Sequence, residues 1–124
     1  MDRERRSEGR LDSKNLISYV CLDENNRQYG QGMGRTLNIS EGGILLETHV
    51  LLDPKSSISL TIALEEELMD FSGTIIFSNG KKDGKYETGV HFSDQNEEKR
   101  RFLRHYITVF KEHRTSNRGE GRDV

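Results

Sequence analysis

The sequence predicts a single, mainly β domain: a six-stranded antiparallel β-barrel followed by one C-terminal α-helix. Three observations predict it: apolar residues gather in short strand-like runs, the connections between the runs are of hairpin length, and the apolar spacing becomes helical near the end. The 124 residues suffice for one domain with a modest core. A closed barrel is favoured because it leaves no unpaired strand edge.

Six segments have the composition of strands. The first, residues 15–22, is rich in β-branched and aromatic residues. The second, residues 28–37, is interrupted by glycines, which in a strand indicate a bulge, a bend or a close backbone approach. The remaining four are residues 43–48, 58–64, 71–78 and 86–92. In the fourth segment the side chains that fall on one face are Ile58, Leu60, Ile62 and Leu64. We expect the acidic residues 65–70 to form a solvated loop and residues 79–84 a turn with positive φ.

The spacing of the apolar residues changes from strand-like to helical in residues 94–113. Their apolar side chains recur at helical spacing and are Phe102, Leu103, Tyr106, Val109 and Phe110. Asp94 followed by Glu97 resembles a helix N-cap, so an amphipathic helix is expected to cover the open end of the barrel. The predicted organisation is a flexible arm at 1–14, the barrel and helix at 15–113, and a disordered tail at 114–124.

Charge and cysteine content narrow the function class. Residues 15–96 carry six positive and twelve negative charges, which disfavours the broad basic face that nucleic acid requires. The single cysteine, Cys21, permits no internal disulfide and fits a reducing compartment. No apolar run is long enough to span a membrane, and no hydrophobic signal opens the chain. We therefore expect a cytoplasmic protein without a membrane span.

An enzyme is the least favoured class. The four histidines, His49, His91, His105 and His113, do not show metal-ligand spacing, and one cysteine cannot form a metal-binding cluster. His91 is interpreted as a strand residue because no nucleophile or carboxylate is paired with it in the sequence. The sequence thus predicts no catalytic residue, no metal and no cofactor.

Two stretches carry the functional hypothesis. The arm contains Arg6 and Arg10 in an R-x-x-x-R arrangement preceded by Arg5, and arginine forks suit phosphate oxygens and guanine edges. The second stretch, residues 38–43, reads NISEGG and lies between two predicted strands. Strand alternation would place Asn38 and Ser40 outward and Ile39 inward. Each stretch also has an ordinary interpretation, a solvated tail for the first and a hairpin turn for the second.

Together, in this order and on this strand pattern, the two motifs resemble those of the PilZ domain family, as do residues 86–94, YETGVHFSD. The resemblance implies a receptor for the bacterial second messenger cyclic di-GMP. It implies that Arg6 and Arg10 contact phosphates and guanines, while Asn38, Ser40, Gly42 and Gly43 line the barrel side of the site. Asn38 stands where many members have aspartate, and Arg5 resembles the residue of members that take a stacked ligand dimer. Arg35 is either a further phosphate contact or part of a surface ion pair.

The expected mechanism is closure of the arm over the ligand, which would change the surface offered to a downstream protein partner. The main alternative is a PilZ-type interaction adaptor that does not bind nucleotide. A barrel that binds single-stranded nucleic acid ranks lower, because that mode requires aromatic residues on a basic face.

Overall fold

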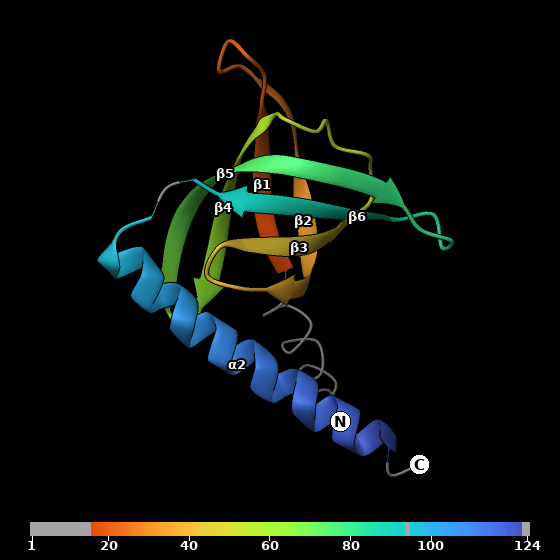
Figure 1. Ribbon diagram of the computed structural model, residues 1–124, viewed down its shortest axis with the longest axis vertical. Coiled ribbons are helices and arrows are strands. Elements are labelled where there is room, and N and C mark those ends of the chain that lie inside the picture. The colour runs from red at the N-terminus through yellow and green to blue at the C-terminus, as the bar shows by residue number, and fades with distance from the viewer. Residues whose placement is uncertain (1–15, 94, 123–124) are drawn as a thin grey trace.

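The computed structural model describes residues 16–93 and 95–122, with side chains up to Glu112. Its strands are β1 (Leu16–Leu22), β2 (Gln28–Ile39), β3 (Gly43–Thr48), β4 (Ser57–Leu64), β5 (Glu67–Gly80) and β6 (Tyr86–Phe92). They form a closed antiparallel barrel in the order β1-β2-β3-β6-β5-β4 (Figure 1). The predicted fold class is confirmed.

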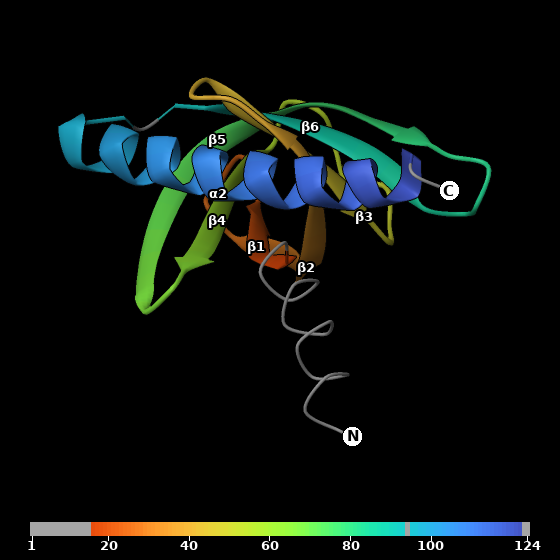
Figure 2. The ribbon, with the colours of Figure 1, turned by 90° about the horizontal axis from the view of Figure 1, so that it is seen from below.

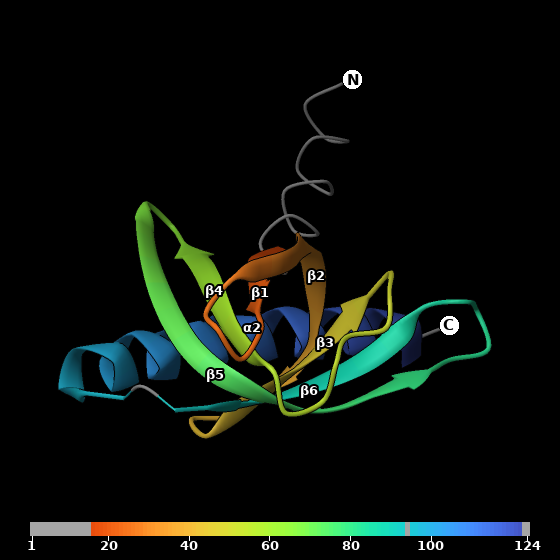
Figure 3. The same ribbon diagram turned by 90° about the horizontal axis from the view of Figure 1, so that it is seen from above.

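The connection from β3 to β4 determines this strand order. After Thr48 the chain does not turn back beside β3; β6 occupies that place instead, pairing Ile44 with Val90 and Leu46 with Thr88. The connecting loop is held to β5, where the Leu52 amide donates to Ser78 Oγ at 3.1 Å and the Ile75 amide to the Ser56 carbonyl at 2.9 Å. The view from above shows β3, β6 and β5 side by side on one flank of the barrel (Figure 3).

The core lies inside the barrel and follows the strand alternation. Ile58, Leu60, Ile62 and Leu64 are all buried, as their shared face predicts. Phe71 and Phe92 meet with ring centroids 5.3 Å apart near one end of this core. These contacts give the barrel a continuous apolar interior.

One helix, α2 (Glu97–Arg122), crosses an end of the barrel (Figure 2). Its buried side chains are Phe102, Leu103, Tyr106 and Phe110, as the helical spacing predicts. Phe102 extends the core cluster, with its ring centroid 6.0 Å from that of Phe71. The hydroxyls of Tyr106 and Thr36, both buried, are hydrogen-bonded at 3.0 Å and join the helix to β2.

The ends of α2 differ from the prediction. Asn96 caps the helix, since its Oδ1 accepts the Lys99 amide at 2.8 Å, whereas Asp94 lies outside the described residues. The helix also continues to Arg122, past its predicted end at residue 113. A helix needs no apolar face to continue, because its backbone hydrogen bonds are internal. The predicted arm, residues 1–14, lies outside the described residues.

The prediction of a solvated loop over residues 65–70 is wrong for all but its start. Glu67 to Asp70 belong to β5 and pair with β4, from Leu64 opposite Glu67 to Thr61 opposite Asp70. Met69 packs against the core, and this contact supports the strand despite its acidic neighbours. The next turn is likewise shorter than predicted, because Asn79 and Gly80 belong to β5. Gly84, in this turn, has the predicted positive φ, 88°.

In the described part of the chain, no helix is both long and apolar enough to cross a membrane.

Candidate functional site

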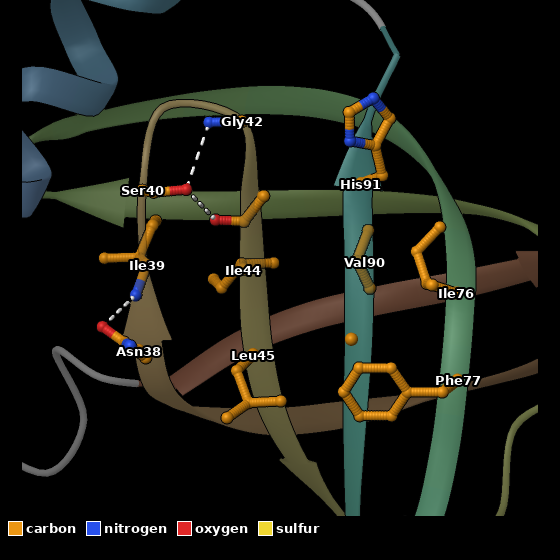
Figure 4. Close-up of a pocket in the computed structure, with 12 residues that line it drawn as sticks. Asn38, Ile39, Ser40, Gly42, Ile44, Leu45, Ile76, Phe77, Val90 and His91 are labelled. Atoms are coloured by element: carbon orange, nitrogen blue, oxygen red, sulfur yellow. Dashed lines mark hydrogen bonds between the residues drawn. The ribbon is translucent and has the colours of Figure 1, made fainter.

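The stretch NISEGG forms the tight connection between β2 and β3. The Ser40 amide donates to the Gly43 carbonyl at 2.9 Å, and the Gly42 amide donates to Ser40 Oγ at 3.3 Å. Asn38 Oδ1 accepts the Ile39 amide at 2.9 Å (Figure 4). Asn38 and Ser40 are exposed and Ile39 is buried, so the predicted alternation is confirmed.

This turn borders a shallow pocket of about 390 Å³ on the outer face of the barrel. Residues of the turn and the start of β3 form one side, and β6 and β5 form the other (Figure 4). The polar side chains that line it are Asn38, Ser40 and His91, and all three are exposed. The apolar lining includes Leu45, Ile76 and Phe77. The pocket therefore combines an apolar surface with a few polar groups, as small-molecule sites do.

A β-bulge in β5 creates the apolar side. The register of β5 against β6 shifts between Ile75, which pairs with Val90, and Phe77, which pairs with Gly89. Ile76 is the extra residue, so Ile76 and Phe77 are both exposed, at 56% and 37%, where regular alternation would bury one of them. The bulge brings an aromatic ring to the pocket.

Two glycines allow the pocket walls to approach. A Cβ built on Gly89 would lie 2.5 Å from Phe77 Cε2, so the absence of a side chain at Gly89 leaves room for the ring. A Cβ on Gly43 would lie 2.5 Å from the Val90 carbonyl oxygen. The absence of a side chain at Gly43 thus allows the close pairing of β3 with β6, in addition to the place in the site lining that the family resemblance implies.

The structure brings four of the predicted site residues together, namely Asn38, Ser40, Gly42 and Gly43. The other three, Arg5, Arg6 and Arg10, lie outside the described residues. Arg35 takes part in an ion pair, with its Nη2 3.1 Å from Glu47 Oε1. Glu47 Oε2 also accepts from Lys81 Nζ at 2.5 Å. The Lys81 hydrogen bond is the largest influence that lowers the pKa of Glu47; burial opposes it, and Arg35 reinforces it.

Comparison with known families decides the assignment. The family model of the PilZ domain matches residues 4–108, most of the chain. The chain belongs to the PilZ domain family. The match begins upstream of Arg5, includes the turn at residues 38–43 and ends within the first half of α2. No curated protein matches this PilZ chain.

Among solved structures, this PilZ domain is similar to K. pneumonia MrkH in its apo state, with a TM-score of 0.56 and 14% sequence identity. The likeness covers 82% of this chain and 47% of MrkH, so the chain spans about half the length of that protein. At this identity the similarity shows the shared fold.

Sequence reasoning missed Leu45, Ile76, Phe77 and the pocket position of His91. Residues 71–78 read as one apolar strand, and the bulge that turns Ile76 and Phe77 outward together has no distinct sequence signal. A glycine two residues before His91, opposite the aromatic Phe77, is the one feature of the PilZ sequence that could have indicated the packing. Among the described residues, no group of three or more His, Cys, Asp and Glu side chains could hold a metal ion.

Proposed function

We propose that this PilZ domain binds cyclic di-GMP on the outer face of the barrel and acts as a receptor for it in the cytoplasm. The observation that carries the proposal is the position of the NISEGG turn beside a pocket with an exposed aromatic ring. The turn offers polar groups to a nucleotide, and Phe77 offers a face on which a purine can stack.

The proposed roles follow from the chemistry of each group. Ser40 Oγ, which donates weakly to the Gly43 carbonyl at 3.5 Å, can rotate to a phosphate or guanine edge. The Asn38 side-chain oxygen is engaged by the Ile39 amide, so its NH₂ is the group suited to donate to guanine O6 or N7. An aspartate at this position would instead accept from guanine N–H groups, so Asn38 changes the expected contact.

The described pocket lining contains no cationic side chain, apart from His91 when it is protonated, whereas cyclic di-GMP carries two phosphates. We assign the neutralising charges to Arg6 and Arg10, with Arg5 beside them, because bidentate arginine contacts are strong and directional. Closure of these residues over the ligand would complete the site and change the surface that a protein partner meets. Ligand binding, and no catalytic step, is the proposed activity.

The adaptor alternative is favoured by a different observation. Several large apolar side chains are exposed on β5 and on the loop after β3, including Val50, Leu51, Ile76 and Phe77. Such side chains can also contact a protein partner directly. An adaptor would use them without nucleotide.

Isothermal titration separates the two functions. Purified protein is titrated with cyclic di-GMP, with GTP and linear di-GMP as controls. Selective, saturable heat supports the receptor, and a stoichiometry of two ligands per chain supports a stacked dimer beside Arg5. Absence of heat with all three ligands at high concentration would overturn the receptor function and favour the adaptor.

A further inference from the structure

Two contacts join the NISEGG turn to the C-terminal region of the chain. Gln95, in the segment before α2, donates from Nε2 to the Glu41 carbonyl at 2.6 Å. On α2 itself, Arg104 Nη1 lies 3.6 Å from Glu41 Oε1, and Arg104 Nη2 lies 3.4 Å from Glu97 Oε2. The Glu41 side chain, at the tip of the turn, is thus directed towards α2.

The ion pair contributes little to the stability of the fold. The Glu41 and Arg104 side chains are 46% and 49% exposed, and ion pairs at such exposure are largely offset by solvent screening and side-chain entropy. An effect on the electrostatic potential of the pocket explains the Glu41–Arg104 pair better than an effect on stability does. Glu41 is flanked in sequence by Ser40 and Gly42, which both line the pocket, while the described pocket lining contains no carboxylate.

A carboxylate at this position would repel an anionic ligand in the pocket. Charges within roughly 8–10 Å interact appreciably at physiological ionic strength, and Glu41 is the residue between two members of the pocket lining, Ser40 and Gly42. Arg104 counters this repulsion in two ways, because it neutralises the carboxylate and holds it towards α2.

We propose that Arg104 is a positioning residue for the anion site: by pairing with Glu41 it sets the affinity for cyclic di-GMP, and through the same pair α2 responds to the ligand. This inference rests on the proposed function and adds its regulation. Coupling is reciprocal, so if the pair raises ligand affinity, the ligand must strengthen the pair. The start of α2 then becomes the element that reports occupancy of the site.

The test compares cyclic di-GMP affinity in wild type, Arg104→Gln, Glu41→Gln and the double variant, with Arg101→Gln as the matched control. Arg101 is exposed on the same helix but lines a separate cavity with Glu67 and Met69 of β5. We expect Arg104→Gln to raise Kd about two- to fivefold and Glu41→Gln to lower it by a similar factor. Arg101→Gln should leave Kd nearly unchanged.

The double variant distinguishes a paired effect from a general charge effect. If Arg104 acts through Glu41, Arg104→Gln changes Kd much less in the Glu41→Gln background. An equal change in both backgrounds, or no change in either, would overturn the inference while the proposed function stands. If wild type does not bind the ligand at all, the proposed function fails and this inference fails with it.

Hydrogen exchange distinguishes coupling to the ligand from a purely structural role of Arg104, because a structural role would not make exchange in α2 depend on the ligand. Cyclic di-GMP should slow exchange of the backbone amides from Lys99 to Arg104 in wild type and have less effect in Glu41→Gln. The melting temperatures of the ligand-free variants should agree with wild type. Ligand-independent exchange in α2, or a large loss of ligand-free stability in Arg104→Gln, would contradict the proposed coupling.

Discussion

The ring of Phe77 packs over Gly89, at a place where even a methyl group on the glycine would lie 2.5 Å from ring atom Cε2. The two residues are paired across β5 and β6, immediately after the bulge that turns Phe77 outward. This packing fixes an exposed aromatic face beside the NISEGG turn. The proposed nucleotide site depends on it.

Phe77→Ala should weaken cyclic di-GMP binding by about five- to a hundredfold, because stacking of a base on an aromatic ring contributes on the order of 1–3 kcal/mol. Titration calorimetry measures the change. Phe77→Tyr keeps the ring and is the matched control, with affinity expected close to wild type. Equal affinities for wild type and Phe77→Ala would show that the ring does not contribute to ligand binding.

Gly89→Ala should displace the Phe77 ring, since the new Cβ would meet the outer atoms of this side chain, which is 37% exposed and can rotate away. We expect weaker ligand binding with a loss of stability of no more than about 1 kcal/mol. Gly30→Ala is the control, because a Cβ at Gly30 meets nothing within 4 Å. Unchanged affinity in Gly89→Ala would show that the position of the ring does not matter for binding.

Arg6→Ala and Arg10→Ala should each remove most of the ligand affinity, at least about tenfold, since charge-assisted bonds to phosphate contribute more than neutral ones. The melting temperature of the ligand-free protein should stay nearly unchanged. Calorimetric titration and thermal unfolding give the two quantities. A large fall in ligand-free melting temperature would make these arginines structural.

Tyr106→Phe tests the attachment of α2 to the barrel. The substitution leaves the buried Thr36 hydroxyl without the partner that it has at 3.0 Å, so we expect a loss of about 1–2 kcal/mol in the free energy of unfolding. Urea denaturation measures it. Tyr29→Phe, which removes an exposed hydroxyl bonded to Ser56, should cost less. A smaller effect at Tyr106 than at Tyr29 would contradict this account of the helix.

Ionised Glu47 should stabilise the fold, and this stabilisation should be lost at acid pH. Its pKa in the folded state is lowered, chiefly by the hydrogen bond from Lys81, so folding favours the ionised form. The stabilisation is complete above the ordinary glutamate pKa and is lost as the pH falls through the lower folded pKa. Glu47→Gln should therefore reduce stability at neutral pH and flatten the acid part of the stability curve, measured by urea denaturation across pH. A parallel curve for the variant would exclude this role.

The local elements could be predicted from the sequence because their signals are local. Alternation placed Ile58 to Leu64 correctly on the core face, and helical spacing identified Phe102 and Tyr106 as buried. The start of β5 was missed because Glu67 and Asp70 resemble loop residues, while cross-strand pairing with β4 and the packing of Met69 outweigh that composition.

The candidate site could be predicted only on the side that a motif encodes. Asn38, Ser40 and Gly43 are close in sequence, whereas Phe77 reaches the same pocket through a bulge and through the pairing of β3 with β6. The contact of Glu41 with Arg104 joins residues on separate elements. Which side chains meet across such elements depends on the barrel order, and residue spacing does not reveal it.

The most direct test of the central claim is a chemical-shift titration of ¹⁵N-labelled protein with cyclic di-GMP. Saturable shifts are expected at the amides of Ser40, Gly42 and Gly43 in the turn and of Gly89 and His91 on β6. The amides of β1, on a different part of the barrel, should move little. Saturable shifts confined to surfaces away from these residues, or no shifts at high ligand concentration, would contradict the proposed site.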